Sequence, residues 1–180
     1  EKPMLNFKKY FIDKDVCDLG CGSADLIVFI KKVIGCKSIK GIDNTNRSKV
    51  NKRRHNLDIT YGNIFDQQFE GADTYYIWIE RPYQEIDILR RLKSYKKKCT
   101  VIIAYNTKSR CQHNQNISYE QVDFNPTCTE CRHLRGVHGK LKILDSFLDK
   151  NHVFKTESYD YYNGKKCRAS GEITYYIVNI

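Results

Sequence analysis

Apolar residues in the first hundred positions form short runs that alternate between two spacings. Five runs are compact enough for buried β-strands: Asp15–Leu19, Ser38–Ile42, Leu57–Tyr61, Thr74–Ile79 and Thr100–Tyr105. Two stretches between them, Asp25–Ile34 and Tyr83–Tyr95, carry apolar residues at helical spacing. Strands that alternate with helices in this way predict an α/β fold with a mostly parallel sheet and helices on both faces.

The second half of the chain interrupts this alternation. From Asn106 to about Lys140 the apolar periodicity lapses, and Asn, Ser, Gln, Cys and His accumulate. We therefore expect one domain, residues 1–180, with an inserted loop containing Cys and His at about 106–140. Beyond it the pattern predicts a helix at Lys142–Leu148 and a strand at His152–Tyr162. A turn at Asn163–Gly164 then leads to a last strand at Ile173–Val178. The chain is thus expected to finish in an antiparallel hairpin.

Composition narrows the class of protein. The 180 residues suit a single domain, and no apolar stretch approaches the roughly 20 residues that a membrane span requires, so we expect no membrane partner. The eight cysteines are spread along the chain and several fall inside predicted strands, which favours free thiols over a disulfide framework. A reducing compartment follows, namely the cytoplasm, with the nucleus as an alternative.

The formal charge of +10 has its richest cluster between Arg47 and His55. The cluster comprises Arg47, Lys49, Lys52, Arg53, Arg54 and His55. A positive field of this kind attracts polyanions, so nucleic acid is a candidate partner. The alternative is a solvated helix face with no ligand.

A glycine-containing turn joins the first predicted strand to the first predicted helix. Gly20 and Gly22 lack Cβ atoms, so the backbone can take positive φ angles and approach a ligand closely. The helix that begins near Ala24 presents free N–H groups beside the turn. In a dinucleotide site the third glycine of G-x-G-x-x-G would stand where Asp25 stands, and a carboxylate there would repel pyrophosphate. This disfavours a nicotinamide-dependent oxidoreductase.

The segment Asp18-Leu19-Gly20-Cys21-Gly22-Ser23-Ala24 resembles the D-x-G-x-G-x-G signature of class I S-adenosylmethionine-dependent methyltransferases, with Ala24 in the last glycine position. The resemblance extends over about Asp15 to Tyr105 and implies a Rossmann-like fold that binds S-adenosylmethionine. It implies that Asp43, at the end of the second strand, accepts hydrogen bonds from the ribose hydroxyls, and that Asn63 and Ile64 lie at the adenine. The implied cofactor-binding residues are Asp18, Gly20, Cys21, Gly22, Asp43, Asn63 and Ile64.

The end of the fourth strand is the expected wall for the methyl acceptor, because ligands of open α/β sheets bind beyond the carboxyl ends of the strands. Glu80-Arg81-Pro82-Tyr83 is similar to the N-P-P-Y motif of adenine-methylating enzymes only in its proline and aromatic. Glu80 is a candidate base and Tyr83 a candidate stacking platform; the alternative is a solvated strand end where Pro82 starts a helix.

A zinc site is a further candidate within the inserted loop. Cys128 and Cys131 stand at zinc-ligand spacing, and Cys111 and His133 can complete a tetrahedral set. The alternative is a substrate loop with free thiols.

Two functions follow from these residues. The first is a methyltransferase that uses S-adenosylmethionine, with a slight lean to a nucleic-acid acceptor. The second is a non-catalytic protein of the same fold that acts as a nucleic-acid-binding or partner subunit. Methyl transfer in the presence of candidate acceptors separates the two.

Overall fold

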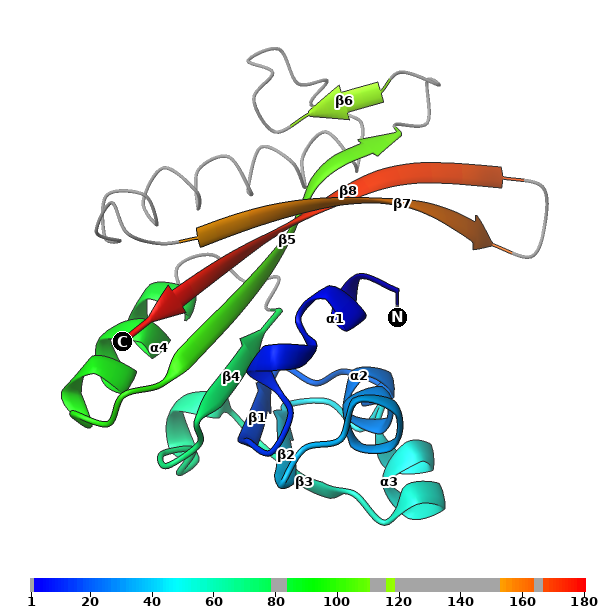
Figure 1. Ribbon diagram of the computed structural model, residues 1–180. Coiled ribbons are helices and arrows are strands. Elements are labelled where there is room, and N and C mark those ends of the chain that lie inside the picture. Colours follow the sequence, from blue (N-terminus) through cyan, green and yellow to red (C-terminus); the bar gives the residue numbers. More distant parts are fainter. Residues whose placement is uncertain (1, 79–83, 111–115, 119–152, 164–166) are drawn as a thin grey trace. The chain divides into compact units, whose positions relative to one another are not determined.

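The computed structural model describes residues 2–78, 84–110, 116–118, 153–163 and 167–180 (Figure 1). The chain divides into two compact units, Glu1–Ile103 with Val178–Ile180, and Ala104–Ile177. Within the described residues, no helix combines the length and the apolar character that crossing a membrane requires.

The first unit contains a parallel sheet in the order β3-β2-β1-β4-β5. Its strands are β1 (Asp15–Leu19), β2 (Ser38–Asp43), β3 (Asp58–Tyr61), β4 (Thr74–Ile77) and the start of β5 (Thr100–Arg110). All five predicted strands are present, with small differences in their bounds. The order reverses between β1 and β4, and a ligand crevice is expected at such a switch point, beyond the carboxyl ends of the strands.

Helices cover both faces of this sheet, as the sequence predicts. The helix predicted after β1 is α2 (Asp25–Phe29) continued by the π-helical turn η2 (Ile30–Ile34), and α3 (Lys49–His55) follows β2. The helix α4 (Gln84–Ser94) connects β4 to β5 and lies on the opposite side (Figure 1). Right-handed crossovers explain this, because the chain moves one way along the sheet from β1 to β3 and the other way from β4 to β5.

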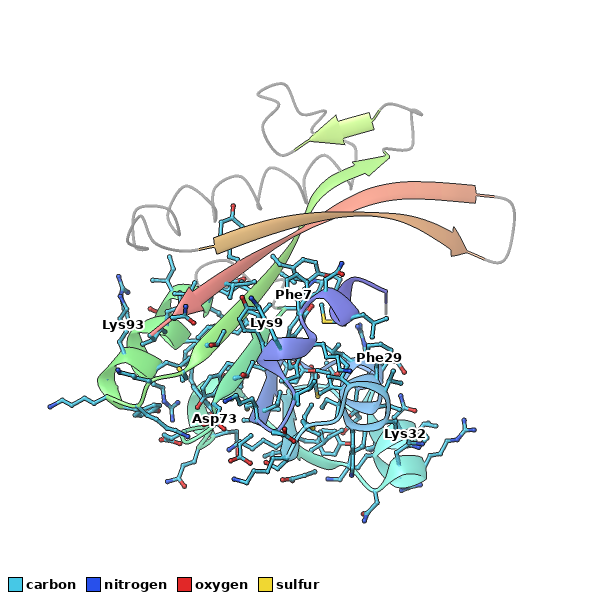
Figure 2. The ribbon with its side chains drawn as sticks, viewed as in Figure 1. Phe7, Lys9, Phe29, Lys32, Asp73 and Lys93 are labelled. Carbon is cyan, nitrogen blue, oxygen red and sulfur yellow. The ribbon has the colours of Figure 1, made fainter. Side chains whose placement is uncertain are left out.

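Besides α3, three short elements of the first unit were not predicted. The helix α1 (Lys2–Asn6) and the 3-10 turn η1 (Lys8–Tyr10) precede β1, and the 3-10 turn η3 (Ile64–Asp66) follows β3. Phe7 and Phe11, on either side of η1, are fully buried and add aromatic surface to the core. Figure 2 labels Phe7 on the N-terminal segment that precedes β1. Burying such side chains stabilises a fold by about 1.5–3 kcal/mol each, which anchors this N-terminal segment.

The second unit contains antiparallel pairs. β7 (Val153–Asn163) pairs with β8 (Cys167–Asn179) from Val153 opposite Ile177 to Asn163 opposite Cys167, which confirms the predicted C-terminal hairpin. β5 continues to Arg110 and pairs with β6 (Asn116–Ser118). The segment predicted as an inserted loop therefore begins as strand, and most of it, together with the predicted helix Lys142–Leu148, lies outside the described residues.

The end of the chain belongs to the first unit. The backbone groups of Cys99 and Ile180 exchange two hydrogen bonds, of 3.0 and 2.9 Å. This reciprocal pairing is antiparallel, so the sheet of the first unit is mostly and not wholly parallel.

Candidate functional site

The turn after β1 is held against the end of β2 by backbone hydrogen bonds. The N–H groups of Gly20 and Cys21 donate to the carbonyl oxygen of Ile42 at 2.8 and 3.3 Å. Gly20 and Gly22 have φ angles of +85° and +53°, in the left-handed region that glycine adopts without a Cβ clash. The predicted backbone geometry of the turn is therefore present.

Ala24 adopts the same left-handed conformation, with φ +65° and ψ +20°, although it carries a Cβ atom. For a residue other than glycine this conformation costs about 1–2 kcal/mol. The strain explains why a glycine is expected at this position of the signature. Ala24 is fully buried, and its N–H donates to the carbonyl oxygen of Cys21 at 2.8 Å, so the surrounding turn holds it in place.

Asp43 links the two loops that border the site. Its Oδ2 accepts a hydrogen bond from the N–H of Gly22 at 2.8 Å, while its Oδ1 accepts from the N–H and Oγ1 of Thr45 at 2.7 and 2.5 Å. Its backbone oxygen accepts from the N–H of Gly62 at 2.9 Å. The carboxylate is 7% exposed and has about four acceptor positions, so one stays available for a ligand donor.

Asp18 lies at the end of β1, next to Gly41 of β2 and Tyr76 of β4 in the sheet. It is 2% exposed. Burial, and after it the nearby carboxylate of Asp43, raise the pKa of Asp18 to about 7. Asp18 therefore holds a proton more tightly than an ordinary carboxyl does, and the carboxylate that borders the cavity at this turn is that of Asp43.

A cavity of about 450 Å³ opens at the carboxyl ends of the strands. Five of the seven predicted cofactor residues line it, namely Gly20, Gly22, Asp43, Asn63 and Ile64. Asp18 and Cys21 are not among the described lining residues. Asp18 is a core residue of β1, and the Sγ of Cys21 lies 2.9 Å from where a Cβ on Gly41 would stand, so both support the turn from within.

Five further residues complete the described lining: Asn44, Thr45, Arg47, Trp78 and Gln84. The sequence interpretation did not assign them to the cofactor site. Thr45 and Arg47 could have been found from their place just after Asp43, because the loop after a parallel strand lies at the ligand end of the sheet. Trp78 is 39% exposed although it is large and apolar, which is typical of a binding surface.

Asn63 has a local structural role in addition to its place in the cavity wall. Its Oδ1 accepts a hydrogen bond from the N–H of Phe65 at 3.2 Å and so caps η3. Arg91 of α4 holds the same segment through its guanidinium, which donates to the carbonyl oxygens of Phe65 and Gln67 at 2.9 and 2.8 Å. The wall expected at the adenine is thus fastened to α4.

The remaining predicted site residues lie outside the described residues. These are the acceptor-side pair Glu80 and Tyr83 and the zinc candidates Cys111, Cys128, Cys131 and His133. In the part of the chain that the structure describes, no group of three or more His, Cys, Asp or Glu side chains is arranged to hold a metal ion. The zinc site stays a prediction.

Comparison by sequence finds no match: no family model and no curated protein matches this chain. Comparison by structure finds many. An O-methyltransferase from Bacillus cereus, solved in complex with SAH, has a TM-score of 0.59 at 10% identity, covering 97% of this chain and 77% of its own. A putative O-methyltransferase from Klebsiella pneumoniae has a TM-score of 0.58 at 13% identity, covering 99% and 77%.

A ribosomal protein L11 methylase from Lactobacillus delbrueckii subsp. bulgaricus has a TM-score of 0.54 at 14% identity, covering 97% of this chain and 75% of its own. Identities this low establish the fold alone. The chain has the Rossmann-like fold of class I S-adenosylmethionine-dependent methyltransferases, as the signature at Asp18–Ala24 predicts.

Proposed function

We propose that this protein binds S-adenosylmethionine in the cavity at Asp43 and transfers its methyl group. The observation that carries the proposal is the position of Asp43, which lines a cavity of about 450 Å³ and accepts a hydrogen bond from the N–H of Gly22 through its carboxylate. This volume lies within the range of about 300–1,000 Å³ that small-molecule sites occupy. The fold is also that of methyltransferases, one of which was solved in complex with SAH.

The residues present fit the cofactor in charge as well as in size. Asp43 offers one acceptor position to a ribose hydroxyl, Ile64 and Trp78 offer apolar surface to an adenine ring, and Asp18 lies close by within the core. S-adenosylmethionine, when bound, supplies a methyl group on a positively charged sulfur, which leaves as a neutral thioether. The carboxylate of Asp43 favours such a positive charge nearby.

In methyl transfer the protein aligns an acceptor with the methyl carbon and removes a proton where the acceptor carries one. We assign these two tasks to Glu80 and Tyr83. They belong to the five residues between Trp78 and Gln84, and both of these flanking residues line the cavity. Replacing Glu80 by Gln is expected to lower kcat while the affinity for the cofactor stays the same.

Trp78 offers a direct test of cofactor binding. It is the only tryptophan of the chain and lines the cavity, so its fluorescence reports a ligand that enters there. We expect S-adenosylmethionine and S-adenosylhomocysteine to change this fluorescence at sub-millimolar concentration, and calorimetry to give the same affinity. The absence of any signal in both measurements would overturn the proposal.

The variant Asp43→Ala tests the residue that carries the argument. We expect at least tenfold weaker binding, since a charge-assisted hydrogen bond contributes about 1.5–3 kcal/mol. Asp58→Ala is the matched control, because Asp58 is exposed and opens β3 at the other end of the sheet. Circular dichroism establishes that both variants are folded. Equal affinities in folded Asp43→Ala and Asp58→Ala would exclude the assigned role.

The acceptor is proposed to be a nucleic acid, on the strength of the net charge of +10 and the basic residues from Arg47 to His55. The structurally similar proteins do not select one acceptor, since they include a ribosomal protein methylase and a putative RNA methyltransferase from Pyrococcus horikoshii. A radiolabelled methyl-transfer screen over RNA, DNA, protein and metabolite pools decides among them.

A second function, a non-catalytic subunit of the same fold, is favoured by the same basic residues. It predicts salt-sensitive binding of nucleic acid without incorporation of label from the methyl donor.

A further inference from the structure

The structure separates the basic residues from Arg47 to His55 into groups with different roles. Lys52 is directed inward: its Nζ donates to the carbonyl oxygen of Ile59 at 2.6 Å and lies 5.0 Å from the centre of the Tyr61 ring. Arg47 lines the cavity. Lys49, Arg53 and Arg54 are exposed on α3, which has no acidic residue.

Two lysines of η2, distant in the sequence, extend this group. The Nζ of Lys32 lies 2.9 Å from the Nδ1 of His55, and the Nζ of Lys31 donates to the carbonyl oxygen of Asn56 at 3.3 Å. Figure 2 shows Lys32 on the side of the first unit where α3 lies. We call the basic group from these two helical segments the basic face; its members are exposed except for half-buried His55. It consists of Lys31, Lys32, Lys49, Arg53, Arg54 and His55.

The charge of the basic face is not neutralised within the described residues, where none of its members takes part in an ion pair. Asp25, the acid that borders α3, instead accepts hydrogen bonds from the Ser23 hydroxyl at 2.5 Å and the Asn51 amide at 2.7 Å. Partial burial, and then the charges of Lys32, Arg54 and Lys31, lower the pKa of His55. Like charges are therefore held close together, an arrangement that an anion would relieve.

We propose that the basic face binds the phosphodiester backbone of a nucleic-acid strand. An arginine guanidinium can donate two hydrogen bonds to the oxygens of one phosphate. Lys31 and Lys32 extend the positive surface beyond α3 alone. Contacts of this kind position a strand without reading its sequence. Arg47, two residues before α3 begins, lines the cavity, so basic side chains run from the cavity edge along α3. The proposal deepens the proposed function by locating the surface that holds the nucleic-acid acceptor, and it rests on that function for this role.

The test measures binding of a labelled single-stranded oligonucleotide, as RNA and as DNA, by fluorescence anisotropy at several salt concentrations. Four phosphate contacts on a single strand predict that the wild-type affinity falls about 50-fold between 50 and 200 mM salt. The test variant replaces four members of the basic face by glutamine, at Lys31, Lys32, Arg53 and Arg54. We expect it to bind at least tenfold more weakly at low salt and to lose most of the salt dependence.

A matched control removes the same charge from the same unit. It carries four lysine-to-glutamine changes at exposed positions of η1 and of the segment before β5, at Lys8, Lys9, Lys96 and Lys98. We expect the affinity of this variant for the oligonucleotide to stay within about twofold to threefold of the wild-type affinity, because the position of the positive charges, and not the net charge, determines binding. Equal losses in the two variants would overturn the proposal.

Two more measurements separate the possible failures. A polyglutamate peptide of equal charge is expected to compete poorly with the oligonucleotide, and equally effective competition would overturn the assignment to phosphodiesters. Trp78 fluorescence is expected to report unchanged cofactor affinity in both variants, which shows that they are folded. If wild-type protein binds the cofactor but no oligonucleotide, the role of the basic face is refuted and the proposed function stands. If it binds the oligonucleotide but no cofactor, the proposed function is refuted and the role of the basic face stands.

Discussion

Replacing Asp18 by asparagine is expected to remove a pH dependence from the stability of this protein. Asp18 is 2% exposed at the end of β1, between two neighbouring strands. Within the described residues its carboxyl group has no hydrogen-bond donor or cation as a partner. A buried carboxyl without such a partner keeps its proton, because ionisation would place a charge away from water.

The magnitude follows from the pKa of Asp18, which is 3.8 in an unfolded chain and about 7 in the folded protein. Because the folded state binds the proton more tightly, this stabilisation is complete below pH 3.8 and is lost as the pH rises through 7. Each pH unit in that window changes the free energy of unfolding by about 1.4 kcal/mol. Wild-type protein should therefore lose about 3 kcal/mol between pH 5 and pH 8.

Urea denaturation at pH 5, 6, 7 and 8 measures this change for wild type, Asp18→Asn and the exposed control Asp58→Asn. The carboxyls of Asp15, Glu70 and Asp73 have lowered pKa values because hydrogen bonds favour their charged forms, so they titrate below the window. We expect the control to follow the wild-type curve and Asp18→Asn to stay nearly constant.

A wild-type stability that is constant from pH 5 to pH 8 would contradict a buried, protonated Asp18, and so would an Asp18→Asn variant whose stability falls as steeply as that of wild type. His55 does not imitate the effect. Its pKa is lowered, so its contribution to stability increases as the pH rises, opposite in sign to that of Asp18.

Three other outcomes are expected. Gly41→Ala should lower the free energy of unfolding by about 1–3 kcal/mol in urea, because the new methyl would stand 2.5 Å from the Cδ1 of buried Ile27; unchanged stability would contradict this packing. Arg91→Lys should cost about 1–3 kcal/mol because lysine loses the fork that reaches two carbonyl oxygens of the η3 segment, and a wild-type Tm would exclude that role. Among the described cysteines, half-exposed Cys36 should react with iodoacetamide before Cys17, because burial raises the pKa of Cys17 to about 12. Mass spectrometry of the labelled peptides gives the order of reaction, and faster labelling of Cys17 would contradict its burial.

Three features could be predicted from the amino-acid sequence: the succession of strands in the first unit with the helices after β1 and before β5, the C-terminal hairpin, and the turn at Gly20 and Gly22. These features follow from local properties: the spacing of apolar residues, the backbone freedom of glycine and the direction in which a parallel crossover must run. Asp43 was assigned through the resemblance to class I methyltransferases, and its place beside the turn agrees with the rule that the carboxyl ends of neighbouring parallel strands meet at one edge of the sheet.

The packing of the elements in three dimensions was needed to show which side chains reach the cavity and which turn away from it. Asp18 belongs to the signature, yet it is buried in β1 and is not among the described residues that line the cavity. Trp78 and Gln84 do line the cavity, although no local pattern assigns either residue to the cofactor. Lys52 turns inward, and Lys32 instead joins His55 from a different helix. The physical reason is that burial, and contacts between residues far apart in the sequence, arise only when separate elements pack together.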